Sequence, residues 1–202
     1  PRSNDIPPPE EARQTLPSPL TAMAWSVYAP SFLVAVGQQA LLIMLPLYAL
    51  ELGGGAGLAA TFLGLNGLGR MLSALPSGAA ISRFGDKPTM LGGLTLVAGA
   101  ALGLCFAQSL WLISVLALVV GAGVGAWMLA RLHYIAEHCP SSHRGRAMTV
   151  LAGLHRLGAL LGPVLGGIVA HYLGYPVLFA GAGALAIIGF VLVVRFTLRA
   201  QA

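Results

Sequence analysis

Charged residues are scarce in this sequence, and acidic ones are the scarcest. Lys, Arg, Asp and Glu together make up 8% of the 202 residues, and only six residues are Asp or Glu. Soluble domains carry about 25% charged residues, so the composition excludes an ordinary soluble domain. The two cysteines, Cys105 within one apolar run and Cys139 at the inner end of another, lie at different depths, and we therefore expect no disulfide.

Motifs for catalysis, metal binding and nucleotide binding are also missing. No nucleophile with a neighbouring base, no metal-ligand spacing and no ATP-binding sequence occurs. We therefore expect neither an enzyme nor a primary active transporter, and no metal or other cofactor. The run Gly121-Ala-Gly123-Val-Gly125 lies within an apolar segment without a preceding strand, so close helix packing explains it better than a nucleotide loop.

Long apolar runs are what the sequence has in abundance, since 57% of its residues are hydrophobic. A bilayer core of about 30 Å is crossed by about 20 residues of helix. Six runs reach this length, at 26–50, 57–81, 89–108, 110–136, 147–172 and 175–196. Lipid offers no water to backbone polar groups, so each run is predicted to be a helix. The expected fold is an all-α integral membrane protein with six transmembrane helices.

The basic residues predict how these helices are oriented. Eight of the 11 Lys and Arg residues lie in the N-terminal segment, in the connections 82–88 and 139–146, and near the C-terminus. Six crossings place these segments on one side, which the positive-inside rule makes cytoplasmic. We expect a multi-pass protein of the plasma (inner) membrane with both termini in the cytoplasm. The pI of about 9.8 follows from this topology, and we expect no nucleic-acid partner.

The N-terminal segment differs from the rest of the chain. Six of the 13 prolines lie within residues 1–22, where apolar residues are few, and this composition is typical of disorder. We expect a disordered, Pro-rich cytoplasmic arm over 1–24, a six-helix transmembrane domain over 25–198, and a cytoplasmic tail over 199–202. A solvated arm is favoured over a docking segment for a proline-binding partner.

Two glycine-rich segments carry recognisable motifs. The connection between the second and third predicted helices reads Gly78-Ala-Ala-Ile-Ser82-Arg83-Phe-Gly85-Asp86-Lys87. The fifth predicted helix contains Gly158-Ala-Leu-Leu-Gly162-Pro163-Val-Leu-Gly166-Gly167. Small residues at four-residue spacing form a groove for close helix contact. The proline removes one backbone hydrogen bond and permits a kink beside that groove.

These segments resemble the N-terminal half of a major facilitator superfamily transporter. The first is similar to the loop motif G-x-x-x-D-R-x-G-x-[KR], with Ser82 at its acidic position and Asp86 where a basic residue is common. The second matches every fixed position of G-x-x-x-G-P-x-x-G-G, a motif associated with exporters and antiporters. The resemblance implies that the residues of conformational change are Gly78, Arg83, Gly85, Lys87, Gly158, Gly162, Pro163, Gly166 and Gly167.

The chain also contains a candidate internal repeat. Gly64-Leu-Asn-Gly-Leu-Gly69 parallels Gly153-Leu-His-Arg-Leu-Gly158, and Gly78 and Gly85 then align with Gly167 and Gly174 at the same offset. Helices rich in Gly and Leu also produce such matches by chance. Interpreted as a true repeat, the match relates helices one to three to helices four to six. The resemblance implies this arrangement, a 3+3 inverted-repeat half-bundle.

Three arginines lie inside the predicted helices, near the middle of the membrane. A rise of 1.5 Å per residue places Arg131 about 12 Å from Cys139, Arg156 about 14 Å from Ala147 and Arg70 about 20 Å from Arg83, all at the cytoplasmic ends of their helices. In lipid each would cost at least about 2.5–3.5 kcal/mol, so all three must face a cavity or protein groups. They either bind substrate or lock the bundle by satisfying backbone carbonyls. No carboxylate lies at this depth, which favours an anionic or polar substrate.

Other polar residues at depth complete the candidate site. Helices one, two, four and five line the cavity in the family, and these helices carry Gln38, Gln39, Asn66 and Trp127. An amide hydrogen bond between helices is the more common role for Gln and Asn, and packing is the alternative for the tryptophan. The candidates for proton coupling are His133 with Glu137, one helical turn apart, and His155. A helix-end interaction is the alternative for that pair.

The resemblance implies a membrane secondary transporter, most simply a small-molecule exporter or antiporter for efflux. Family members contain two six-helix halves, and this chain contains one. Two like-oriented copies around an axis along the membrane normal would reproduce both halves. We therefore predict a parallel homodimer surrounded by membrane lipid. The alternatives are an accessory or regulatory subunit that pairs with another transporter half, and a fragment of a longer chain.

Overall fold

The computed structural model describes residues 28–139 and 141–199, and this part of the chain forms six α-helices without strands. The helices are α3 (Ala29–Glu51), α4 (Ala56–Phe84), α5 (Asp86–Leu104), α6 (Leu110–His138), α7 (Ser141–Leu173) and α8 (Tyr175–Arg199). Each contains a span long and apolar enough to cross a bilayer. The predicted all-α, six-helix membrane fold is therefore confirmed. The predicted disordered arm over 1–24 lies outside the described residues, as does all of the predicted tail except the end of α8.

The helix boundaries depart from the prediction where polar turns extend a helix. The fifth helix begins at Ser141 rather than 147, so the expected connection over 139–146 is wrong for most of its length. Arg144 and Arg146 lie exposed in the first turns of α7. Apolar length marks only the part of a helix that lies in lipid, so polar turns beyond the bilayer escape detection.

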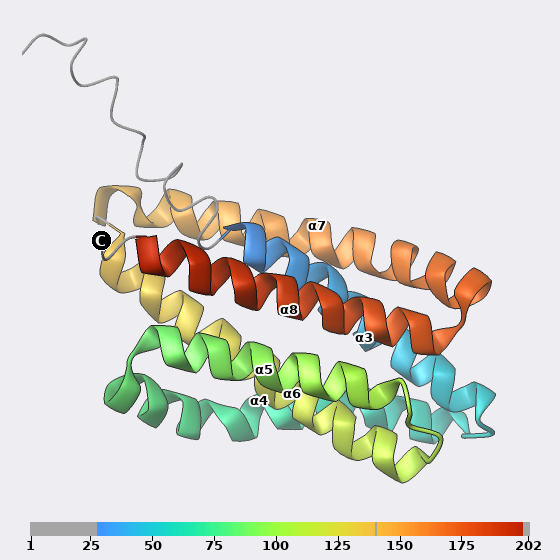
Figure 1. Cartoon of the computed structure of the whole chain (residues 1–202). Helices are drawn as coiled ribbons and strands as arrows, with labels where there is room; N and C mark the ends of the chain where they lie inside the picture. The colour runs from blue at the N-terminus through green and yellow to red at the C-terminus, as the bar shows by residue number, and fades with distance from the viewer. Residues whose placement is uncertain (1–27, 140, 200–202) are drawn as a thin grey trace, which may run out of the picture.

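The helices pack in two groups of three (Figure 1). Helices α7 and α8 pack on α3, whereas α4 and α5 pack on α6, and the two groups meet where α5 lies against α8. The first helix of each three-helix unit thus packs against the second and third helices of the other unit. This reciprocal exchange is the arrangement of an inverted 3+3 repeat.

Equivalent glycines in α4 and α7 occupy equivalent places. Gly85 and Gly174 follow the two helices with φ of 88° and 87°, a conformation that glycine adopts without steric cost. Gly69 packs on the backbone of α6 at Leu118, and Gly158 packs on the backbone of α3 next to Ala35. Because the matched residues make matched contacts, the repeat interpretation holds over a chance match.

Helices α4 and α7 lie at the margins of the bundle. Their membrane spans are only 22% and 17% buried, compared with 56% for the span of α3. On α4 the buried residues form a single stripe at helical spacing: Ala59, Phe62, Asn66, Gly69, Ser73 and Ser77. The rest of the surface of both helices is exposed and rich in large apolar side chains. Among the described helices, these two therefore have the most exposed faces for lipid or a partner.

Candidate functional site

The glycine motif of the fifth transmembrane helix holds α7 against α3. A Cβ atom added at Gly162 would lie 2.6 Å from the carbonyl oxygen of Val36, and one at Gly158 would lie 2.6 Å from the Cβ of Ala35. Both distances are shorter than van der Waals contact, so only glycine allows the two backbones this approach. The predicted groove exists, while the part these glycines play in conformational change stays a prediction.

The glycine run of α6 makes the matching contacts on the other side. Gly121 meets the backbone of α4 at Asn66, and a Cβ atom at Gly123 would lie 2.7 Å from the carbonyl oxygen of Gly93 in α5. Gly125 faces Ser73 of α4. The packing interpretation of this run is therefore confirmed, because all three glycines are in contact with neighbouring helices.

Arg131 is the buried cation of the bundle core. It is 5% exposed, and its Cζ atom lies 5.8 Å from the ring centroid of Trp127, one turn earlier on α6. This geometry is a cation–π contact. Its Nε atom has no hydrogen-bond partner among the described residues. A buried guanidinium with a free donor is suited to accept an anionic or polar partner.

A small cavity joins four predicted site residues from three helices. Gln38 of α3, Trp127 and Arg131 of α6 and His155 of α7 line it, together with Ser31. Its volume of about 10 Å³ holds about one water molecule. The cavity therefore brings the candidates together but does not by itself admit a substrate.

Arg70 lies in the middle of α4 and is bound to its own helix. Its Nε atom donates to Oδ1 of Asn66 at 3.2 Å, and Nδ2 of Asn66 donates to the carbonyl oxygen of Ala117 at 3.4 Å. The amide thus links α4 to α6, as expected for an interhelical hydrogen bond. Arg70 remains half-buried.

Arg156 is the exposed cation of the predicted set. It projects from α7 beside half-buried His155, and the described residues offer it neither a hydrogen bond nor an ion pair. Gln39, half-buried on α3, faces the Gly162 contact. The predicted cations therefore form two groups: buried Arg131 in the core, and a surface set made of half-buried Arg70 on α4 and exposed Arg156 on α7.

The predicted pair of His133 and Glu137 has a third member that the sequence reasoning missed. Nδ1 of His133 lies 2.8 Å from Oδ1 of Asp86, whereas its Nε2 lies 3.9 Å from Oε1 of Glu137. Asp86 is the first residue of α5 and is 8% exposed. Asp86 stands where the loop motif commonly has a basic residue. This departure from the motif was the sign in the sequence that Asp86 has a role of its own.

The loop motif itself surrounds this pair. Ser82, at the acidic position, is exposed and donates to the carbonyl oxygen of Ala79 in its own helix. Gly78 and Gly85 line a polar hollow with Asp86 and His133. Arg83 stacks on the ring of Phe84 at 5.3 Å, and Lys87 is half-buried. The acidic position of the motif is thus occupied by Ser82, and the acid of this connection is Asp86, which pairs with His133 of α6.

Comparison with known proteins identifies the family. The family model for the Major Facilitator Superfamily matches residues 28–202. The chain belongs to this superfamily. It is therefore a multi-pass membrane protein of a transporter family, and the family points to transport rather than to an enzyme.

Several transporters are similar to this chain. The multidrug resistance protein MdtH of Aeromonas hydrophila is 28% identical over 79% of this chain and 40% of that protein. The niacin transporter NiaP of Acinetobacter baylyi is 27% identical over 62% of this chain and 29% of that protein. A homologue of the multi-drug resistance efflux pump PmrA from Lactococcus lactis is 30% identical over 80% and 41%. The chain thus spans less than half the length of these relatives.

A solved structure shows the same fold. The crystal structure of a mutant peptide transporter POT in complex with alafosfalin superimposes with a TM-score of 0.72 over 89% of this chain and 38% of that chain. The sequence identity is 18%. The likeness supports the six-helix half-bundle of the superfamily and carries no information on substrate.

Proposed function

We propose that this chain is one half of a secondary transporter that exports a small anionic or polar molecule. Two like-oriented copies enclose the substrate cavity between their α4 and α7 faces. The end of the bundle with Arg83, Lys87, Arg144 and Arg146, which we call the basic end, lies in the cytoplasm because the opposite end has no such cluster. The membrane is the inner membrane.

The exposure of Arg156 carries this proposal. Arg156 lies 15 residues from Ser141 and 17 from Leu173, or about 22 and 26 Å from the ends of α7 by its rise per residue. A guanidinium at that depth costs at least about 2.5–3.5 kcal/mol in lipid. The face of α7 that carries it must therefore be covered by water or protein.

The small size of the inner cavity supports a substrate site that a second copy helps to enclose. The space around Arg131 holds about one water molecule, so no more than one polar group of a substrate can reach Arg131. The rest of the substrate must bind outside the single bundle, against the surface set of cations. A pocket that binds a small molecule needs walls on most sides. A second copy placed against α4 and α7 supplies the missing walls.

Charge balance supports an anionic or polar substrate. In this sequence the acids from residue 28 onward are Glu51, Asp86 and Glu137, which lie at helix ends. Three arginines at mid-depth thus face no carboxylate, and a substrate carboxylate or phosphate would neutralise them, bound bidentately by a guanidinium. A cationic drug would have no counter-charge at this depth.

Export is supported by the glycine motif of α7 and by relatives described as multidrug resistance and efflux proteins. His155 next to Arg131, and His133 with Glu137, are our candidates for proton coupling in an antiport cycle. Because the chain covers less than half of each relative, the activity of a whole transporter requires the second half that we propose.

Cross-linking in the membrane tests the arrangement. In a background without native cysteines, Leu160→Cys on α7 is combined with Leu72→Cys on α4, both exposed positions. Oxidation should give a disulfide-linked dimer. The control pair, Ile188→Cys on α8 and Leu96→Cys on α5, is also exposed but lies on helices outside the proposed interface and should stay monomeric. Equal cross-linking of both pairs would contradict the proposed homodimer. So would the detection of only monomer by native mass spectrometry with lipid retained.

Transport assays test the substrate class. A thermal-shift screen of small carboxylates and organic phosphates supplies a ligand, whose flux is then measured in proteoliposomes. Arg131→Ala and Arg156→Ala should abolish this flux, whereas exposed Arg146→Ala at the basic end should not. Full activity of both variants would remove the arginines from the site. Co-purification with a different six-helix chain, without flux by the protein alone, would favour an accessory subunit.

A further inference from the structure

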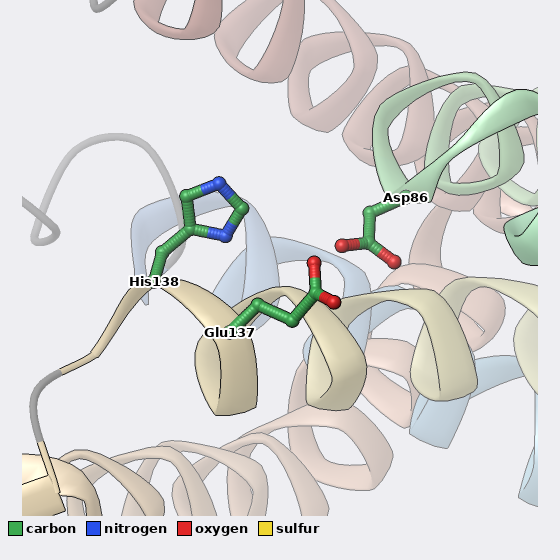
Figure 2. Close-up of side chains that lie close together, drawn as sticks. All are labelled: Asp86, Glu137 and His138. Atoms are coloured by element: carbon green, nitrogen blue, oxygen red, sulfur yellow. The ribbon is translucent and has the colours of Figure 1, made fainter.

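A second cluster of chemically active side chains lies at the basic end, away from the transport site. Asp86 approaches from the start of α5, and Glu137 and His138 approach from the end of α6 (Figure 2). One potential ligand atom from each residue lies within 4.8 Å of the others. The carboxylates and the imidazole come from segments about 50 residues apart, so no ligand spacing is visible in the sequence.

We propose that Asp86, Glu137 and His138 bind a divalent transition-metal ion of the Zn²⁺ class, which fastens the start of α5 to the end of α6. Two carboxylates balance the charge of a divalent ion. An imidazole nitrogen beside them favours transition metals over Mg²⁺ or Ca²⁺, which prefer oxygen ligands throughout. The site shares Glu137 with one of the pairs proposed above for proton coupling, but metal binding itself does not require transport.

Asp86 is the fixed member of the site. It is 8% exposed, and one of its oxygens holds Nδ1 of His133 at 2.8 Å. This contact orients the carboxylate and leaves its other oxygen for a metal ion, as hydrogen bonds to metal ligands commonly do. The helix dipole favours an acidic residue at the start of α5, whether or not a metal ion binds there. The dipole does not explain why two potential metal ligands from α6 lie next to that acid.

Glu137 and His138 are the exposed members of the site. Both are exposed at the last turn of α6, so their side chains adjust without disturbing packing. Nδ1 of His138 lies 3.0 Å from the carbonyl oxygen of Tyr134, and the two rings stack with centroids 4.2 Å apart. Both contacts are exposed and local to the last turns of α6, so His138 can exchange them for a metal bond at small cost, because water replaces the imidazole at the carbonyl.

Space for a hydrated ion lies next to the cluster. A cavity of about 520 Å³ is lined by Asp86, His133 and Glu137, together with Gly78 of α4 and Gly85 of the turn between α4 and α5. Water entering this cavity completes the coordination of an ion that has three protein ligands. A bound ion would thus hold the turn that carries the loop motif against α6.

Calorimetry on the full chain without a polyhistidine tag tests the site. Zn²⁺ titrated into the protein in nanodiscs should bind at one ion per chain, and millimolar Mg²⁺ should not displace it. Glu137→Gln and His138→Ala should each weaken Zn²⁺ binding by at least about tenfold. His133→Gln changes a residue that holds Asp86 but does not bind the ion, and it should weaken binding by at most about 100-fold. The matched controls Glu51→Gln and His171→Ala change exposed residues near the opposite end and should leave binding unchanged.

Stability provides a second readout that separates metal loss from misfolding. Zn²⁺ should raise the Tm of the parent chain but not that of Glu137→Gln, whose Tm without metal should match the parent because the side chain is exposed. Absence of saturable Zn²⁺ binding would overturn the proposal. So would binding that survives both ligand substitutions, or Mg²⁺ binding tighter than Zn²⁺ binding.

Discussion

Replacing Gly162 by alanine tests how the bundle is held together. The added Cβ atom would lie 2.6 Å from the carbonyl oxygen of Val36, 2.8 Å from the Cβ of Gln39 and 2.9 Å from the backbone nitrogen of Ala40. Two of these atoms are backbone, so α3 and α7 must separate to make room. Overpacking of this kind costs about 1–3 kcal/mol, whereas alanine gains about 1 kcal/mol of helix propensity over glycine. We expect a net loss of up to about 2 kcal/mol.

Gly153 provides the matched control on the same helix. A Cβ atom there meets nothing within 4 Å, so Gly153→Ala receives only the propensity gain and should stabilise the protein by up to about 1 kcal/mol. At the other glycines of the motif, the change in stability should follow the distance between the added Cβ atom and its nearest neighbour. Gly158→Ala should resemble Gly162→Ala, and Gly167→Ala, with 3.8 Å to the nearest atom, should resemble the control.

The assay is reversible unfolding in mixed micelles, followed by tryptophan fluorescence, with midpoints compared across the series. Opposite signs for Gly162→Ala and Gly153→Ala would support backbone contact as the origin of the motif. Equal effects at both positions, or stabilisation at Gly162, would refute the reasoning, because helix propensity alone would then explain the series.

Further substitutions separate stability from function. Arg131→Met should leave the unfolding midpoint unchanged or higher, since replacing a buried charge by an apolar side chain of similar size is often neutral or stabilising, and it should abolish flux of the anionic ligand. Arg156→Ala should abolish flux with an unchanged midpoint, because the side chain has no partner within the described half; a lowered midpoint would assign it a structural role. Asp86→Ala should cost about 1–3 kcal/mol by removing the hydrogen bond between a buried carboxylate and His133, whereas Glu137→Ala should cost less than about 1 kcal/mol because its contact is exposed.

The helices and their order were predictable because lipid imposes apolar length directly. The groove formed by the glycine motif was also predictable, since glycine spacing has one simple steric meaning. Sequence reasoning placed Arg131 and Arg156 in one class, yet the first is buried and the second exposed. Their difference depends on how α6 and α7 are rotated in the bundle. In a membrane helix that is apolar on all sides, hydropathy does not reveal this rotation.

The cluster around Asp86 was missed for a different reason. His133 and Glu137 were recognised because they lie one turn apart on one helix, a spacing that sequence shows directly. Asp86 joins them through the packing of α5 on α6, and only the three-dimensional structure provides that contact. Its position in the loop motif marked it as unusual, but not as a partner of α6.

The close glycine contacts bear on how such a half-bundle moves. Gly162 fixes α7 to α3 and Gly121 fixes α4 to α6, each by backbone contacts that leave no space between the helices. The cavity between these helix pairs holds about one water molecule. Sliding within the bundle would break these contacts, so we infer that each half moves as a rigid body. In the proposed dimer, alternating access would then arise at the faces of α4 and α7, where rocking of one copy against the other changes which side of the membrane reaches Arg156.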